Sequence, residues 1–197
     1  AAVFATALAV RLLPARGGVP VDYDEGVYVT GAALLWKGLL PYRDYVFLHP
    51  PGILLFLVPW GLGGPLFTLG AARVASSILG AVSATLMTRL VSGRAALPVA
   101  LFWILWPELV SSERGVFLEP LMNCAGLAAL VVLKGAPTVR GATFAGVLCA
   151  AALLVKVWGG VWCLMAFLLC PQPLRRRLVL AAAATLGAVT LPFILAS

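Results

Sequence analysis

The stretch LFTLGAARVASSILGAVSATLMTRLVSGR (66–94) decides the class of fold to which this sequence belongs. Residues 66–88 form one apolar run, which contains a single charge at Arg73 and ends in a basic turn. Because about 20 apolar residues suffice for a helix to cross a bilayer, this run predicts a transmembrane helix. A charge inside a span is costly, so Arg73 either has a functional or paired role or reaches the interface with its long side chain.

The composition of the whole chain agrees with a membrane protein. Of its 197 residues 62% are apolar and 11% charged, whereas soluble domains carry about 25% charged residues. The mean hydropathy is +1.06. In such a chain a net charge of +7 indicates orientation in the membrane, and we expect no nucleic-acid partner. The cysteines lie in apolar runs without CxxC spacing and predict neither a disulfide framework nor a metal site.

Further apolar runs on both sides of 66–88 predict six more spans, at 1–13, 95–107, 116–133, 142–155, 157–170 and 178–195. The run at 52–64 is shorter and contains Pro59, which is typical of a re-entrant or interfacial segment. The predicted fold class is therefore an all-α polytopic membrane protein with about seven transmembrane helices.

The domain organisation expected from these runs is a single transmembrane module over 1–197. Its sequence begins and ends inside apolar runs, so we expect it to be truncated at both ends. It comprises a partial first span (1–13), an external loop with interfacial or re-entrant helices (14–65) and six further spans (66–197).

The charged residues fall into two groups of loops. The loops at 89–94, 134–140 and 175–177 hold basic residues and no acid, and all seven acids lie in the other loops. The positive-inside rule places the basic loops in the cytoplasm and the acids outside. To keep the basic loops on one side, 52–64 must not cross the membrane, and 142–170 must break near 156–160 into two short helices.

The segment VDYDEGVY (21–28) concentrates three acids in four positions. Asp22 lies three residues before Glu25, which is the spacing of a capping box. One cap needs one carboxylate, so capping explains Asp22 better than it explains the adjacent pair Asp24–Glu25. Two adjacent carboxylates repel each other, and partial burial would raise the pKa of one of them, which suits a general base at the membrane surface. The alternative is that these acids only cap a helix and keep the loop hydrated.

The residues after these acids predict a helix that lies on the membrane surface. In GVYVTGAALLWKG (26–38), Val27, Gly31 and Leu34 recur at helical spacing, and Gly38 is placed to end the helix. In PYRDYVFLHPPG (41–52), the two prolines hold His49 in an extended, stiff segment. The side chain of His49 is either an interfacial polar group or a proton carrier or phosphate contact.

The whole segment YDEGVYVTGAALLWKGLLPYRDYVFLHPPG (23–52) resembles the first external loop of GT-C glycosyltransferases. The closest likeness is to the branch that contains protein O-mannosyltransferases and aminoarabinose transferases. These relatives have an Asp-Glu pair, a Tyr, a small-residue helix, a Gly turn and a basic residue before Pro-Pro. Asp24–Glu25, Tyr28, Gly38 and His49 fill these places, and His49 stands where the relatives usually carry Lys.

Three later segments resemble the same family more weakly. Residues 66–94 are similar to its Arg-bearing second span, and the segment 111–133 places Glu119 where relatives have a second external acid. Residues 146–160 are similar to a span that ends in an external Lys, here Lys156. The shared module of that family has seven spans.

The resemblance implies a mannosyltransferase-like enzyme of the cell envelope, in a bacterial plasma membrane with its active site outside. It would transfer a sugar from a polyprenyl-phosphate donor to a hydroxyl of a glycan, lipid or protein acceptor, with inversion. Asp24 would be the general base and Glu25 its helper or alternate. The leaving phosphate requires cations and donors. The expected substrate-binding residues are Tyr28, Arg43, His49, Arg73, Arg114, Glu119 and Lys156.

Several alternatives stay open at this point. Glu119 is equally well explained as an acid in the first turn of a helix. No metal ligand set is expected, although a divalent metal at the carboxylates is left open by the resemblance. In place of an enzyme, the chain could be a fragment of a multi-span transporter or a non-catalytic membrane subunit of the same fold.

Overall fold

The computed structural model describes residues 1–13, 21–91, 93–135 and 137–196. All the regular elements in these ranges are helices, with no strand; one isolated bridge joins Pro41 and Tyr45. The elements are α1 (Ala2–Leu12), α2 (Tyr23–Trp36), α3 (Gly52–Leu57), η1 (Val58–Gly63), α4 (Pro65–Leu90), η2 (Gly93–Ala95), α5 (Ala96–Leu105), α6 (Pro107–Arg114), α7 (Leu118–Lys134), α8 (Val139–Val155), η3 (Val157–Gly159), α9 (Gly160–Leu169) and α10 (Gln172–Ala196).

Two of these helices, α4 and α10, are long and apolar enough to cross a membrane. The bent pair formed by α5 with η2 and α6 brings the number to three if the pair is a single span, with a bend of 55°. The chain is therefore an all-helical protein with the character of a membrane protein.

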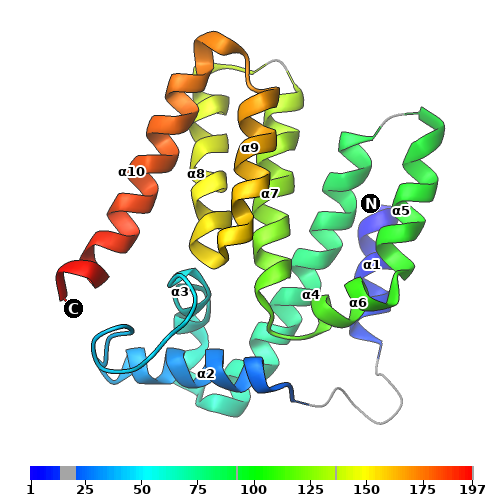
Figure 1. Cartoon of the computed structure of the whole chain (residues 1–197). Helices are drawn as coiled ribbons and strands as arrows, with labels where there is room; N and C mark the ends of the chain where they lie inside the picture. The colour runs from blue at the N-terminus through cyan, green and yellow to red at the C-terminus, as the bar shows by residue number, and fades with distance from the viewer. Residues whose placement is uncertain (14–20, 92, 136, 197) are drawn as a thin grey trace.

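The helices form two groups that meet along α4 and α7 (Figure 1). Helices α1, α4 and α5 lie on one side and α7, α8, α9 and α10 on the other, while α2 crosses beneath one end of the molecule. Helix α4 contacts both α1 and α7 and so joins the two groups.

The basic turns lie at one end of the molecule and the acid-bearing helix α2 lies at the other (Figure 1). The carboxyl ends of α4, α7 and α9 lie at the end opposite α2 (Figure 1). At that end the Lys134 ammonium donates hydrogen bonds to the carbonyl oxygens of Arg89 and Leu90, both at 2.9 Å. The basic turns that the sequence assigns to one group thus gather at one end, and the acid-bearing helix α2 lies at the other.

Both ends of α2 are fixed by local interactions that the sequence predicts. Asp22 caps the helix: the Asp24 N–H donates to its carboxylate, and the Asp22 N–H donates to Glu25, which confirms the capping box. At the other end Gly38 has φ +79°, and the N–H groups of Gly38 and Leu39 donate to the carbonyls of Leu35 and Leu34. This pair of bonds is a Schellman motif, which requires the left-handed conformation that glycine provides.

One face of α2 is buried against the protein and another lines a groove. Its buried residues are Glu25, Tyr28, Val29, Gly31 and Ala32. Val27 and Leu34, which recur at helical spacing in the sequence, line a groove on the outer side. The buried face includes the carboxylate of Glu25, which pairs with Arg73 on α4.

The chain breaks between α8 and α9, as expected. Lys156 leaves the helix in an extended conformation (φ −153°, ψ 139°), and the one-turn helix η3 follows. A Cβ at Gly159 would lie 2.5 Å from the backbone of Ala152, so the close return of the chain requires a residue without a side chain.

The segment predicted to be re-entrant or interfacial forms the short helices α3 and η1. The side chains of Ile53, Leu54 and Leu57 are fully buried. A Cβ at Gly52 would lie 2.5 Å from the carbonyl oxygen of Leu154, so α3 begins in direct contact with the end of α8. Helix α3 also packs on α2 and thereby connects α2 to the α8–α9 break.

Two predicted boundaries are wrong. Residues 108–114 were expected in a loop but belong to α6, and the arginines at 175–177 lie inside α10, which already begins at Gln172. Both helices have a proline in their first turn, Pro107 and Pro173, where the missing N–H breaks no helical hydrogen bond.

Candidate functional site

Glu25 lies at the centre of the contacts that hold α2 against the rest of the protein. Glu25 is 1% exposed. Its carboxylate accepts hydrogen bonds from Arg73, Val116 and Asp22. Arg73 on α4 donates two of them, Nε to Oε1 at 2.9 Å and Nη2 to Oε2 at 2.5 Å. The N–H of Val116 donates at 2.8 Å and that of Asp22 at 3.0 Å. Of the two roles left open for Arg73, the structure therefore supports the paired one.

The ionisation of Glu25 follows from this environment. Burial raises the pKa of its carboxyl, but the hydrogen bonds from Arg73, Asp22 and Val116 and the charge of Arg73 outweigh burial, so the pKa lies below its ordinary value. The raised pKa expected for one of the two adjacent carboxyls is therefore not found at Glu25. A carboxylate that already accepts several hydrogen bonds is a poor proton acceptor, so the contacts of Glu25 suit the fixing of α2 better than they suit a base.

Asp24, the neighbour of Glu25, has the opposite environment. It is exposed, and within the described part of the chain its side chain takes part in no hydrogen bond or ion pair. The capping box fixes its backbone and the Glu25–Arg73 pair fixes its helix. Asp24 is therefore an unengaged carboxylate on a rigid support.

Tyr28 lies one helical turn after Asp24, and its ring is buried. Burial raises the pKa of this phenol, and the charges of Asp24, Glu119 and Asp22 raise it further. Tyr28 therefore stays protonated among carboxylates and keeps a hydrogen that it can donate. Its ring contacts His49 edge to face, with the ring centroids 5.7 Å apart.

Glu119 and Lys156 form an ion pair beside Tyr28. The Lys156 Nζ donates to Oε1 of Glu119 at 2.5 Å, so the first turn of α7 is joined to the α8–α9 break. Five of the predicted site residues thus come from two helices, α2 and α7, a loop and the α8–α9 break. We call Asp24, Tyr28, His49, Glu119 and Lys156 the Asp24 cluster.

Two predicted phosphate ligands are engaged elsewhere. Arg43 is exposed and pairs with the adjacent Asp44, with Nη2 to Oδ2 at 2.8 Å. Arg114 donates from Nη2 to the carbonyl oxygen of Val10 at 2.5 Å and so binds the end of α1. Neither arginine makes a hydrogen bond to a member of the Asp24 cluster in the described ranges.

A second buried ion pair was not predicted. Arg11 on α1 donates through Nε to Oε2 of Glu113 at 2.6 Å and through Nη2 to the same oxygen, and both side chains are inaccessible to solvent. Trp103 Nε1 donates to the other oxygen of Glu113 at 3.3 Å. Each charge is noticeable in the sequence, but the two partners are 102 positions apart, so the sequence does not reveal their pairing.

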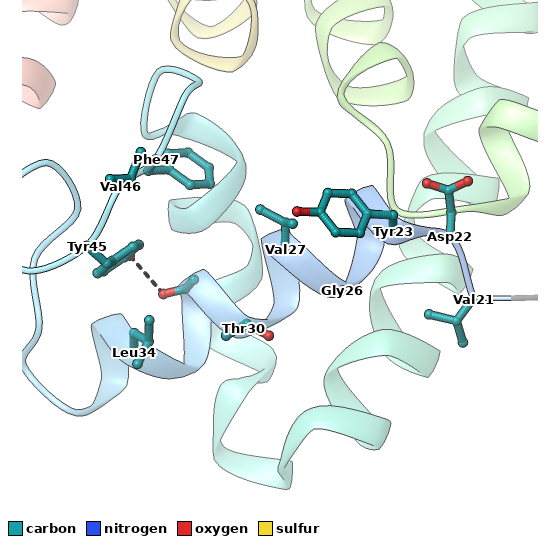
Figure 2. A pocket seen from close by; sticks show the side chains of 11 residues that line it. Val21, Asp22, Tyr23, Gly26, Val27, Thr30, Leu34, Tyr45, Val46 and Phe47 are labelled. Carbon is teal, nitrogen blue, oxygen red and sulfur yellow. Dashed lines mark hydrogen bonds between the residues drawn. The ribbon is translucent and has the colours of Figure 1, made fainter.

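A hollow lies along the outer side of α2 (Figure 2). Its volume is about 510 Å³, and it runs between α2 and the extended segment 45–47. Val27, Leu34, Val46 and Phe47 make most of its wall apolar, with Asp22 at one end. The hydroxyl of Tyr45 donates to the carbonyl oxygen of Gly31 and fixes the segment to the helix. Asp24 does not line this groove.

The search for a metal site among the described residues and the comparisons with known proteins both gave negative results. In the described ranges no three His, Cys, Asp or Glu side chains are grouped closely enough to hold a metal ion. Comparison of the chain with protein-family models, with curated proteins and with solved structures gave no match.

Proposed function

We propose that this chain is a GT-C-type glycosyltransferase module that transfers a sugar from a polyprenyl phosphate to an acceptor hydroxyl. The observation that carries the proposal is the division of roles between two adjacent carboxylates. Glu25 is buried and neutralised by Arg73, whereas Asp24 is exposed and unengaged. The phenol of Tyr28, one helical turn after Asp24, lies in the field of Asp24 and Glu119. The ring of Tyr28 contacts His49, and Glu119 holds Lys156. The division of roles between the two carboxylates is unnecessary for a cap, and it suits one base on a fixed support.

In the proposed reaction Asp24 accepts the proton of the acceptor hydroxyl. The acceptor oxygen forms a bond to the anomeric carbon, and the bond from that carbon to the phosphate oxygen breaks on the opposite side, so the configuration inverts. The electron pair leaves with the prenyl phosphate. Since a phosphate is a good leaving group, it needs positive charge and donors more than it needs an acid.

Lys156 and His49 are the groups proposed for the phosphate. The ammonium of Lys156 is held by Glu119 at 2.5 Å and remains partly exposed, so it can add a phosphate contact without being released. His49 and the protonated phenol of Tyr28 lie next to each other and offer further donors.

The proposed placement in the membrane has seven spans, formed by α1, α4, α5, α7, α8, α9 and α10. Helix α2 would lie in the outer interface of a bacterial plasma membrane, with the Asp24 cluster facing outside. The gathering of the basic turns at the opposite end supports this orientation, because basic turns face the cytoplasm.

The proposal is tested with membranes that contain the protein and undecaprenyl-phosphate donors carrying radiolabelled mannose or aminoarabinose. Label should move from the donor to a cell-envelope product, and Asp24→Asn should lower this transfer by about 10² or more. Glu108→Gln removes another exposed acid and should leave transfer unchanged. Equal transfer by Asp24→Asn and the wild type would overturn the assignment of the base. A parallel assay with a chelator reports whether a divalent metal takes part.

A further inference from the structure

The connection between α6 and α7 is held by two buried ion pairs, one on each side. Glu113, at the end of α6, pairs with Arg11 on α1. Three residues later, the N–H of Val116 donates to Oε1 of Glu25, which is itself paired with Arg73. The carboxylate that positions α2 is therefore hydrogen-bonded to a short backbone segment whose other end is fixed by a second charge pair.

Helix α4 supports both pairs along one face. Arg73, Ser77 and Gly80 are spaced by four and three residues and so share that face. Arg73 binds Glu25, and the Ser77 hydroxyl is 3.4 Å from the carbonyl oxygen of Glu113, to which it donates. A Cβ at Gly80 would lie 2.6 Å from both Arg11 Nε and Glu113 Oε2, so glycine leaves the space that the second pair occupies.

The segment between the two pairs has little room to adjust. Gly115 is buried, and a Cβ there would collide with the ring of Phe117 and lie 3.4 Å from Oε1 of Glu25. Val116 is fully buried. A displacement of Glu113 is therefore expected to reach the Val116 N–H, because close-packed interiors transmit strain.

We propose that Arg11 and Glu113 are positioning residues for the proposed transfer reaction. They set the Val116 N–H, which together with Arg73 sets Glu25 and hence the end of α2 that carries Asp24. The pair itself is inaccessible to solvent and, within the described ranges, makes no hydrogen bond to a member of the Asp24 cluster. It therefore acts through the connection 113–116 and through the face of α4 that both pairs share. The effect on sugar transfer rests on the proposed function. The coupling of the Arg11–Glu113 pair to the position of Glu25 does not depend on it.

The test uses the double variant Arg11→Met/Glu113→Leu. Replacing both partners of a buried ion pair by apolar residues often leaves a protein folded, whereas removing one partner leaves an uncompensated buried charge. The matched control is Asn123→Leu, which removes another interhelical contact, the hydrogen bond from Trp162 Nε1 at 3.2 Å. The control lies between α7 and α9, away from the connection 113–116.

Two measurements are made on each variant of the full chain in lipid nanodiscs. The first is hydrogen–deuterium exchange at the Val116 and Asp22 amides, both of which donate to Glu25. The double variant should exchange faster at both amides, and the control should exchange as the wild type does. The second is sugar transfer, in which kcat should fall by about 10² with KM unchanged, because a small displacement of a catalytic group is costly.

The outcomes test the structural coupling, the catalytic role of the pair and the proposed function separately. Unchanged exchange in the folded double variant overturns the inference, whatever the activity is. Faster exchange with unchanged kcat overturns the catalytic role of the pair. Faster exchange in a protein whose wild type transfers no sugar leaves the mechanical coupling standing and rejects the proposed function instead.

Discussion

At the scale of single residues, adjacent positions in this sequence have very different environments. Asp24 and Glu25 are neighbours of the same chemical type, yet only Glu25 is buried and charge-paired. The helix separates them because successive residues point about 100° apart, so one carboxylate faces α4 and the next faces solvent. One residue of the pair therefore anchors the helix to α4, while the other leaves a carboxylate open to solvent.

Glu25 predicts a specific dependence of stability on pH. Because its folded pKa is lowered, its contribution is present above the ordinary pKa of a glutamate and is lost as pH falls through the folded value. At neutral pH Glu25→Gln should lower the free energy of unfolding by about 3–5 kcal/mol, since it leaves Arg73 without its counter-ion. Thermal unfolding of both proteins should show a difference that shrinks below about pH 4.5. A difference that stays constant from pH 7 to pH 3 contradicts the ion-pair role.

At the scale of secondary-structure elements, glycines in the helices leave room for side chains of neighbouring helices to pack closely. Helix α4 contains two glycines in its interior with contrasting surroundings. Gly80 lies under the Arg11–Glu113 pair, whereas a Cβ at Gly70 would meet nothing within 4 Å. The same substitution at these two sites therefore separates packing from helix propensity.

Gly80→Ala should destabilise the protein by about 1–3 kcal/mol because the added methyl group overpacks the buried ion pair. Gly70→Ala should stabilise it by up to about 1 kcal/mol through helix propensity. Chemical unfolding in a mild detergent, followed by circular dichroism, measures both. Equal effects at the two sites would mean that the space at Gly80 is not needed.

Interactions between residues close in the sequence could be predicted from it, and those between residues far apart could not. The capping box at Asp22, the stop at Gly38 and the break at Lys156 follow from a few adjacent residues, and all three are present. Helix α6 was missed because its polar sequence looks like a loop, and its stability depends on the buried contacts of Glu113. The pairing of Arg73 with Glu25 spans 48 residues, so sequence could single out each charge but not join them.

At the scale of the whole molecule, the separation of charge between two ends predicts a topology. Single cysteines are introduced at Tyr23, Trp158, Arg140 and Arg176 after the four native cysteines are replaced. A membrane-impermeant maleimide applied outside should label the first two positions, which are exposed at the α2 end. The two arginine positions should react only after the membrane is opened.

This experiment also tests the break between α8 and α9. If residues 142–170 were one span, the cysteines at Arg140 and Arg176 would react on opposite sides. Labelling of both from the same side is the result expected for two helices that reverse at Lys156.

The seam between α4 and α7 has charged contacts at both of its ends. At one end Lys134, from α7, binds the last carbonyls of α4, and at the other Glu25 bridges Arg73 of α4 and the backbone just before α7. An outward rotation of one helix group relative to the other must therefore break a charged contact at one of these ends. Any ligand that opened this seam would have to supply that free energy from its own binding.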